Sequence, residues 1–416
     1  MSFSTTAEVI PTDLSPQGVD LTQVCQQFGT PLYLYDADVI IRQIEQLKSA
    51  FTYPKLKFKY AAKALTNVSV LKLIRQQGID LDVVSIEEAH IGLEAGFSAQ
   101  QIMYTPSGVP FAEIDEAIAL GIQMNIDSLP LLRYIGERYG NTIPCCIRLN
   151  PDIRAGGHAK ISVGHNESKF GVALSQLDLA VAIVEEYGII INGLHIHTGS
   201  DIKDPEVFVQ GAKRLYAAAR HFSDLQFIDF GSGFKVAYKE GDVATDIPQL
   251  AQLMEESFRE FCEEYGQELE MWFEPGKFIV SDSGYLLTEV TVVKENPGIN
   301  FIHVNTGLNH LLRPMMYDAY HEIVNLTNPD GPLQPYQVVG YICETDNIGE
   351  NRMLPQVRPG DILIIKNAGA YGFSMASNYN SRLRPAEVLI HQGAAKLIRQ
   401  RETMQDLLQN QIEIPL

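Results

Sequence analysis

The chain has 416 residues, and its 32 Lys and Arg against 51 Asp and Glu give a formal net charge of −19 at neutral pH. Hydrophobic residues make up 45% and charged residues 20%, a mixture that is typical of globular proteins and excludes a largely disordered chain. The acidity argues against a nucleic-acid partner, because neutralising phosphates needs clustered Lys and Arg, and the length predicts about two domains.

The cysteines and the first residues of the chain predict its compartment. The five cysteines are an odd number without a CxxC pair, which favours neither a disulfide framework nor a zinc site. The first residues, MSFSTTAEVIPTDLS, lack the basic and apolar regions of a secretion signal. No apolar run reaches the ~18 residues of a membrane helix, so we expect a cytoplasmic protein without a membrane partner.

Short apolar runs alternate with longer amphipathic segments over most of the chain. Eight runs have the composition of buried parallel strands and cover residues 56–63, 79–85, 101–105, 122–127, 144–150, 189–197, 226–231 and 270–274. Helical spacing of apolar residues occupies 68–77, 85–95, 111–120, 131–139, 176–187, 205–221 and 247–265, with Ser85 as a candidate N-cap. This alternation favours an α/β fold built on a (β/α)8 barrel, with an open doubly wound sheet as the alternative.

Strand-like segments replace the alternation after Ser283. They cover 285–294, 301–305, 336–343 and 361–367, and a helical pattern returns only at 395–409. We therefore expect a barrel over residues 35–280 and a second, mainly β-sheet C-terminal domain over 281–416. Residues 1–34 are expected to join the second domain, since the run at 31–36 (PLYLYD) precedes the barrel pattern.

Polar residues stand where the predicted barrel strands end, which is where barrel enzymes place their chemistry. Lys63 ends the first run, YAAK. A lysine flanked by small residues can be desolvated there, which lowers its pKa and frees the amine as a nucleophile, although a lone lysine more often reaches into solvent. His195 and His197 share one face of a strand. Zinc ligation, stacking on a planar cofactor and a place in the core are the interpretations that this HxH pair leaves open.

Two turns containing glycine follow the last two strands. Gly231–Gly233 (GSG) can bring backbone N–H groups to a phosphate, to which Ser200 can add a hydroxyl, but an ordinary turn fits equally well. Glu274–Lys277 (EPGK) closes the eighth strand. A carboxylate at that position can hold a ring nitrogen protonated, or simply pair with a nearby cation.

The β domain contains two further unusual stretches. Cys343–Asp346 (CETD) places a thiol and two carboxylates after an apolar run, and a buried inert cysteine is the default interpretation for Cys343 alone. Residues 367–372 (NAGAYG) form a small-residue loop that contains Tyr371.

Eight motifs, in order along nearly the whole chain, resemble those of the fold type III pyridoxal-phosphate decarboxylases. This family includes the diaminopimelate, ornithine and arginine decarboxylases and shares its barrel with alanine racemase. The motifs are YAAKA at 60–64, DVVS at 82–85, HIHTGS at 195–200, DFGSG at 229–233, EPGK at 274–277, LLRPMMYDAYH at 311–321, CETD at 343–346 and NAGAYGFSMASNYNSRLRPAEVL at 367–389. The sixth and eighth look most like the diaminopimelate branch.

The resemblance implies a role for each matching residue. Lys63 would attach pyridoxal 5'-phosphate covalently, His197 would stack on its ring, and Glu274 would pair with its ring nitrogen. The rest of the cofactor site would comprise Ser200, Gly231, Ser232, Gly233, Pro275, Gly276, Lys277 and Tyr371. Cys343 resembles the cysteine that protonates the carbon from which CO2 leaves. The distal end of the substrate would be held by Lys277, Arg313, Tyr317, Glu344 and Tyr371.

The resemblance also implies a homodimer with shared active sites, in which Cys343 and Glu344 enter the site of the other subunit. No metal is expected, because the HxH pair has no third ligand at clear spacing. A distal amino-acid group needs both signs of charge, Arg313 for its carboxylate and Glu344 for its ammonium, whereas ornithine would give Arg313 nothing to bind. The expected reaction is therefore decarboxylation of meso-diaminopimelate to L-lysine and CO2, at the end of lysine biosynthesis.

Four departures from the family pattern bear on the substrate rather than on the reaction. Lys277 stands where arginine is usual, Ser232 where glycine is usual, CETD replaces CESGD, and SIEEA at 85–89 replaces SGGE. A lysine offers a carboxylate a point charge instead of a bidentate fork. The alternatives are a decarboxylase of carboxynorspermidine, ornithine or arginine, a barrel metal hydrolase that uses His195 and His197, and a pyridoxal-phosphate carrier, which would not need Cys343.

Overall fold

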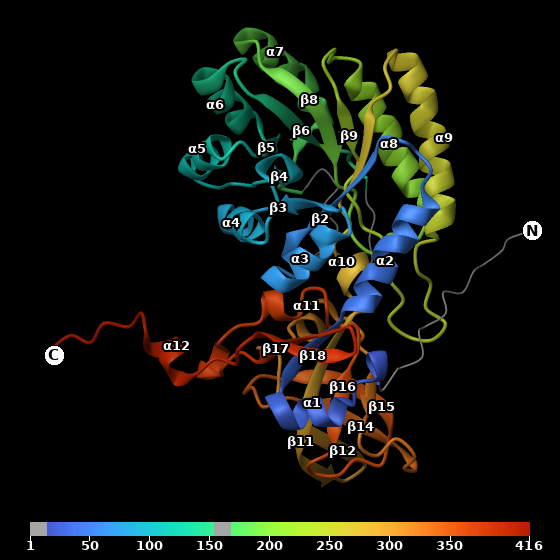
Figure 1. Cartoon of the computed structure of the whole chain (residues 1–416), viewed down its shortest axis with the longest axis vertical. Helices are drawn as coiled ribbons and strands as arrows, with labels where there is room; N and C mark the ends of the chain where they lie inside the picture. The colour runs from blue at the N-terminus through green and yellow to red at the C-terminus, as the bar shows by residue number, and fades with distance from the viewer. Residues whose placement is uncertain (1–14, 154–167) are drawn as a thin grey trace, which may run out of the picture. The chain divides into compact units, whose positions relative to one another are not determined.

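The computed structural model describes residues 15–153 and 168–416, and within them the chain divides into two compact units (Figure 1). Unit 1 is built from Ile41–Val236 and Val243–Ile279, and unit 2 from 15–40, Ala237–Asp242 and Val280–Leu416. The short segment Ala237–Asp242 thus belongs to unit 2 although unit 1 flanks it on both sides, an excursion that the sequence pattern does not predict.

Unit 1 is a closed ring of eight parallel strands. They are β2 (Leu56–Ala61), β3 (Asp80–Val83), β4 (Ile102–Tyr104), β5 (Gln123–Ile126), β6 (Pro144–Asn150), β8 (Ile190–Ile196), β9 (Phe227–Asp229) and β10 (Glu270–Phe273). Each strand pairs with the next, and β10 pairs with β2 to close the ring, while β7 (Val172–Ala173) adds a short pairing to β6. The predicted barrel and all eight of its strands are confirmed.

Helices alternate with these strands and surround the ring (Figure 1). They are α2 (Ala37–Ala50), α3 (Val68–Gln76), α4 (Ile86–Glu94), α5 (Phe111–Ala119), α6 (Leu129–Tyr139), α7 (Leu177–Tyr187), α8 (Pro205–Ala219) and α9 (Ile247–Tyr265), with the single turn α10 (Lys277–Val280) after the last strand. Ser85 caps α4 as predicted, since its hydroxyl accepts a hydrogen bond from the Glu88 N–H at 3.1 Å.

The barrel strands are recognisable in the sequence because helices cover their outer faces and side chains fill the interior. Every residue of β6 after Pro144 is buried, and so is every residue of β8 after Ile190. Polar residues interrupt these buried strands, among them Asp82, Asn125 and His195. Buried polar side chains need hydrogen-bond partners, so these positions are candidates for a functional role rather than for hydrophobic packing alone.

Unit 2 is built on a sheet of nine strands. They are β1 (Leu32–Asp36), β11 (Gly284–Asn296), β12 (Ile299–Val304), β13 (Ile323–Asn325), β14 (Leu333–Val339), β15 (Asn347–Pro355), β16 (Ile362–Ile365), β17 (Ala386–His391) and β18 (Ala394–Arg399), accompanied by helices α1 (Leu21–Phe28), α11 (Arg313–Tyr317) and α12 (Met404–Leu408). The early strand β1 lies between β11 and β17, and its Leu32 and Leu34 are part of the core of this sheet.

The helical pattern predicted over 395–409 is wrong for its first half. The structure instead has the strand β18, which pairs antiparallel with β17, and only the five-residue helix α12 follows. Gln392 and Gly393 join the two strands, both with positive φ (56° and 69°), which is the backbone of a tight hairpin turn. Pairing with β17 overrides the local preference of the segment, as tertiary context commonly does.

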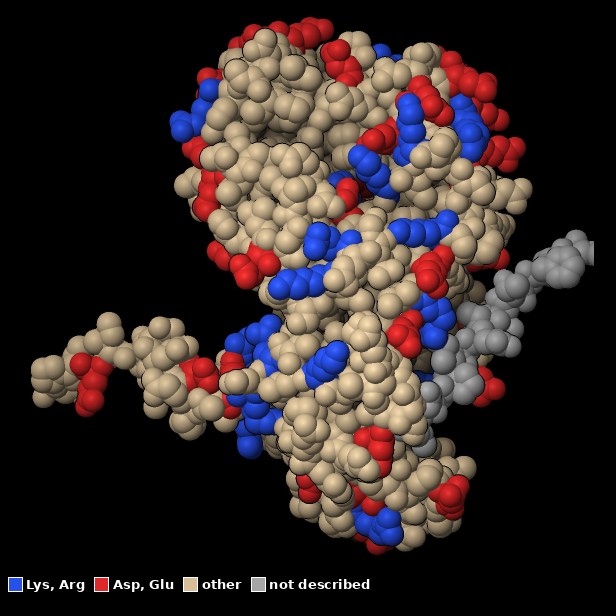
Figure 2. Space-filling model, viewed as in Figure 1, with Lys and Arg blue, Asp and Glu red and all other residues tan. Residues whose placement is uncertain are grey.

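Acidic side chains lie on the surface of both units and are interspersed with basic ones on the face drawn in Figure 2. Some of the arginines are paired within unit 2: Arg384 with Glu402, and Arg399 with the fully buried Glu387. Across the described residues, none of the helices is both long enough and apolar enough to span a lipid bilayer.

Candidate active site

The residues predicted at the strand ends of unit 1 lie at one end of the barrel. Lys63 follows β2, His197 follows β8, Gly231 stands two residues after β9, and Glu274 follows β10. The carboxyl ends of parallel strands meet at one rim, so these residues are brought together although they are more than a hundred positions apart along the chain at the extremes. Their mutual electrostatic effects show the proximity, since the charge of Lys63 acts on both His197 and Glu274.

Lys63 lies in a short 3-10 turn, Ala62–Ala64, that follows β2. Ala62 and Ala64 on either side are fully buried, whereas Lys63 is exposed. The desolvated lysine that the sequence suggests is not observed, because Lys63 is exposed. An accessible amine beside acids and histidines is positioned to react with a carbonyl compound that enters the mouth of the barrel.

Glu274 and His195 form a buried pair inside the barrel. His195 Nε2 lies 3.2 Å from Glu274 Oε2, and His195 Nδ1 lies 3.0 Å from the amide nitrogen of Asn125. An amide N–H donates, so Nδ1 accepts and the proton of the neutral ring stands on Nε2, facing the carboxylate. Burial lowers the pKa of His195, which favours this neutral form.

Three carboxyl groups of this interior, those of Asp82, Asp229 and Glu274, have pKa values shifted in opposite directions. Burial and the charge of Glu274 raise the pKa values of Asp82 and Asp229 well above their usual range. Burial works in the same direction on Glu274, but His195 and Lys63 outweigh it and lower the pKa of that carboxyl. Neighbouring carboxylates in a low dielectric disfavour one another's ionised forms, and these shifts favour the ionised form at Glu274 more than at Asp82 or Asp229.

Glu274 retains one oxygen for another partner. Its Oε1 atom is buried and accepts no hydrogen bond from an N–H or a hydroxyl group within 15–153 and 168–416, although the carboxyl of Asp229 lies close enough to share a proton with Glu274. A buried carboxylate oxygen is normally paired, and a protonated pyridine nitrogen would supply the missing donor. The donor set therefore fits the pyridoxal phosphate that the motifs imply.

His195 and His197 differ in their surroundings, which bears on whether they could bind one metal ion together. His197 is half-buried, and burial together with the charges of Lys63 and Arg148 lowers its pKa well below the usual value, so its ring is neutral. His195, Asp229 and Glu274 have ligand-type atoms within 4.8 Å of one another, but His197 belongs to no such group among the described residues. A zinc site built on both histidines is therefore not supported, and a neutral flat ring at the strand end remains suited to stacking.

Glycines allow three loops at this rim to approach one another closely. A Cβ atom on Gly231 would lie 2.5 Å from the carbonyl of Ile196, and one on Gly233 would lie 2.4 Å from the carbonyl of Gly199; their φ angles are 62° and 130°. Gly276 packs against Ala61 in the same way, with 3.1 Å to its Cβ. Exposed backbone N–H groups in such loops can bind an anion.

Lys277 pairs with a residue that the sequence analysis missed. Its Nζ atom lies 2.8 and 2.9 Å from the two carboxylate oxygens of Asp201 and 3.0 Å from the hydroxyl of Ser200. Asp201 follows HIHTGS directly and has a φ of 60°. The positive charge of Lys277 is thus matched within unit 1, and the lysine fixes the loop that contains Ser200.

In unit 2, Cys343 and Glu344 lie beside the last motif of the sequence. The Cys343 thiol lies 3.5 Å from Glu344 Oε2 and accepts a hydrogen bond from Asn380 Nδ2 at 3.4 Å. The hydroxyl of Tyr379 donates to Glu344 and lowers the pKa of that carboxyl. Cys343 is exposed, so the buried inert cysteine is excluded. No sequence signal predicted that Tyr379 and Asn380 would contact it.

The other predicted substrate residues also lie in unit 2. Arg313 and Tyr317 are the first and last residues of α11, and Tyr371 has a φ of 57° in the loop after β16. Arg313 is buried, with 5% of its surface exposed, and its hydrogen-bond partners are Tyr238 and His321. The excursion Ala237–Asp242 supplies Tyr238, which the sequence analysis did not identify.

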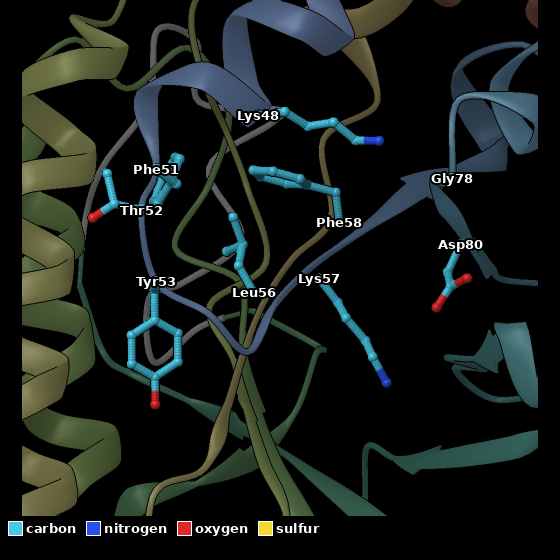
Figure 3. A pocket seen from close by; sticks show the side chains of 9 residues that line it. All are labelled: Lys48, Phe51, Thr52, Tyr53, Leu56, Lys57, Phe58, Gly78 and Asp80. Carbon is cyan, nitrogen blue, oxygen red and sulfur yellow. The ribbon is translucent and has the colours of Figure 1, made fainter.

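A cavity of about 260 Å³ lies elsewhere in unit 1 (Figure 3). Leu56, Lys57 and Phe58 from the beginning of β2 line it, together with Lys48 and Asp80, whereas Lys63 follows the end of the same strand. Lys57 is paired with Glu270 and Lys48 donates to a backbone carbonyl, so the lysines of this cavity have partners within the protein.

Comparisons with known proteins agree with this geometry. A family profile described as "Pyridoxal-dependent decarboxylase, pyridoxal binding domain" matches residues 37–281. A diaminopimelate decarboxylase of Methanothermobacter thermautotrophicus is 37% identical over 404 residues, which cover 95% of this chain and 94% of the relative. A diaminopimelate decarboxylase of Escherichia coli K12 is 33% identical over 416 residues, with 95% and 97% covered.

A solved structure has the same architecture. The crystal structure of diaminopimelate decarboxylase from Helicobacter pylori, complexed with L-lysine, matches with a TM-score of 0.87 and 32% identity, covering 94% of this chain and 98% of that one. Both the pyridoxal-binding profile and full-length relatives thus agree with the site described above. The chain belongs to the pyridoxal-dependent decarboxylases, in the diaminopimelate decarboxylase family.

Proposed function

We propose that this protein decarboxylates meso-diaminopimelate to L-lysine and CO2 with pyridoxal 5'-phosphate as cofactor, in lysine biosynthesis. The observation that carries the choice of substrate is Arg313, a buried guanidinium whose partners are two neutral side chains. Buried charges are normally paired, so Arg313 needs an anionic partner, and the distal carboxylate of diaminopimelate would supply one. A diamine-type amino acid would not.

Residues of unit 1 would hold the cofactor. Bound pyridoxal phosphate supplies an electron sink for the pair left on the α-carbon when the bond to the carboxylate breaks. Lys63 would attach it covalently, His197 would stack on the ring, and Glu274 would keep the ring nitrogen protonated through its Oε1 atom. Ser200, Gly231, Ser232, Gly233, Pro275 and Gly276 would surround the phosphate, and Tyr371 is a further candidate for binding the cofactor.

Lys277 would act through Ser200 rather than on the substrate. Because Asp201 already balances its charge, Lys277 is suited to ordering the loop that contains Ser200. Arg313 would then bind the distal carboxylate of the substrate. The distal ammonium group would face Glu344, whose hydrogen bond from Tyr379 favours the ionised form. Tyr317 and Tyr371 would complete the substrate site.

A panel of amino acids tests the substrate. We expect CO2 release from meso-diaminopimelate with a kcat/KM at least about a hundredfold above that for L-ornithine, L-arginine or carboxynorspermidine, since a site built for a polar group strongly rejects analogues that lack it. A preference for ornithine would reject diaminopimelate as the substrate. Stoichiometric zinc in a colourless protein would instead favour the metal hydrolase.

Cys343 would return a proton to the α-carbon after CO2 has left. We expect Cys343→Ala to lower kcat by about 10² to 10⁴, the usual contribution of a positioned acid, while the cofactor stays bound. The lysine formed per CO2 released should fall below one, because protonation at the α-carbon is no longer favoured. Cys343→Ser retains a proton at this position and serves as the matched control; wild-type turnover in the alanine variant would contradict the role.

We further propose a homodimer in the cytoplasm, in which Cys343 and Glu344 serve the active site of the other subunit. The five free cysteines are compatible with a reducing compartment. Mixing a Lys63→Ala protein with a Cys343→Ala protein tests the sharing, because hybrid dimers would regain one complete site and the activity would rise above that of either variant. Activity that does not rise on subunit exchange would count against shared sites.

A further inference from the structure

Arg313 stands in an unusual environment within unit 2. Its Nη1 atom lies 3.3 Å from His321 Nε2, and its Nη2 atom donates to the hydroxyl of Tyr238 at 3.0 Å. The Tyr238 ring also faces the guanidinium, with 5.2 Å from Cζ to the ring centroid. No carboxylate in the described part of the chain lies within 4.0 Å of Arg313. Its two polar partners, His321 and Tyr238, are neutral side chains. Its remaining N–H donors are available to a ligand.

The proton on His321 can be assigned from its second contact. His321 Nδ1 lies 2.8 Å from the backbone carbonyl of Lys366, and a carbonyl only accepts, so Nδ1 carries the proton. The lone pair of Nε2 therefore faces Arg313 and accepts from it. His321 is fully buried, and burial followed by the charge of Arg313 lowers its pKa to about 3, so the ring stays neutral at ordinary assay pH.

We propose that His321 is a positioning residue that aims the Arg313 guanidinium at the second carboxylate of the substrate while leaving its positive charge uncompensated. A carboxylate in the place of His321 would orient Arg313 equally well but would neutralise it, and an apolar side chain would leave Nη1 without an acceptor. His321 thereby contributes to selecting ligands that have a carboxylate at this end. This inference rests on the proposed function, in which Arg313 binds that carboxylate.

Two diamines that differ by one carboxylate provide the test. L-lysine and cadaverine have the same chain of five carbons between amino groups, but only lysine has a carboxylate for Arg313 to bind. We expect the wild-type enzyme to be inhibited more strongly by lysine, and His321→Leu to raise the inhibition constant of lysine by about tenfold or more with little change for cadaverine, since hydrogen bonds to charged groups are worth that much. The KM for meso-diaminopimelate should rise similarly, with kcat changed less than about threefold.

Two further variants distinguish positioning from stability. His321→Gln retains an acceptor oxygen and should recover most of the preference for lysine over cadaverine. His310→Leu is the matched control, because His310 is also buried in unit 2 and bonded to a carbonyl, that of Leu383 at 3.0 Å, but has no contact with Arg313. It should lower thermal stability without changing that preference. Equal weakening of lysine and cadaverine by His321→Leu, or loss of the cofactor absorbance, would reduce His321 to a structural role and overturn the proposal.

Arg313→Met separates this inference from the function on which it rests. We expect it to abolish the preference for lysine, and His321→Leu added to it should have no additional effect, because His321 acts through Arg313. If Arg313→Met abolishes the preference and His321→Leu leaves it intact, the positioning role fails and the substrate stands. If Arg313→Met leaves the preference intact, the proposal that Arg313 binds the carboxylate is itself rejected.

Discussion

Replacing Lys63 by alanine is expected to abolish covalent attachment of pyridoxal phosphate and to lower turnover by more than about a thousandfold. Lys63 is exposed at the end of β2, near the carboxyl groups of Glu274 and Asp82, so it is both accessible and close to the groups that would hold the cofactor. The visible absorbance of the purified protein before and after borohydride reduction, followed by peptide mapping, would identify the labelled lysine.

The opposite end of the same strand offers a matched control. Lys57 is also exposed and pairs with Glu270 at 2.9 Å, and an exposed pair of this kind contributes little to stability. Lys57→Ala should therefore retain the cofactor and the activity. A label on Lys57 or on the buried Lys59, or full turnover in Lys63→Ala, would show that the wrong amine has been chosen.

Glu274→Gln is expected to lower kcat by about 10² to 10³, the usual loss when one preorganised electrostatic contact is removed from a reacting centre. Glutamine has nearly the same shape but no charge, so it would no longer hold a ring nitrogen in its protonated form. The glycine loops and Ser200 are unchanged in this variant, and the protein should still bind pyridoxal phosphate. Stopped-flow measurement of CO2 release with the cofactor absorbance recorded in parallel would separate the two effects.

Glu270→Gln, at the other end of β10, is the control for this variant and should be nearly silent. A cofactor analogue without the ring nitrogen provides a second check, because it removes the group on which Glu274 is proposed to act. With that analogue, wild-type and Glu274→Gln proteins should have similar activity. A large difference between them would mean that Glu274 acts elsewhere, for instance only by orienting His195, which lies 3.2 Å away.

Much of the architecture could be predicted from local sequence. The eight barrel strands are short apolar runs between helices. They are recognisable because both faces of such a strand are buried, so most of its residues are apolar. The cap at Ser85 depends on residues three positions apart, so it was predictable as well. The segment after Gly393 was not, because its strand exists only through pairing with β17, and no local pattern reports a partner strand.

The sequence by itself determined which residue types stand at the ends of the barrel strands, and with them the family and its cofactor. The tertiary structure alone decided how these groups share protons and charge. The pKa of Glu274 is lowered against the effect of its own burial because folding brings His195 of β8 and Lys63 at the end of β2 to its carboxyl group. Arg313 lacks a counter-charge because its partner 75 positions away is the neutral Tyr238. Such properties depend on burial and on charges that folding brings together, neither of which is a property of neighbouring residues.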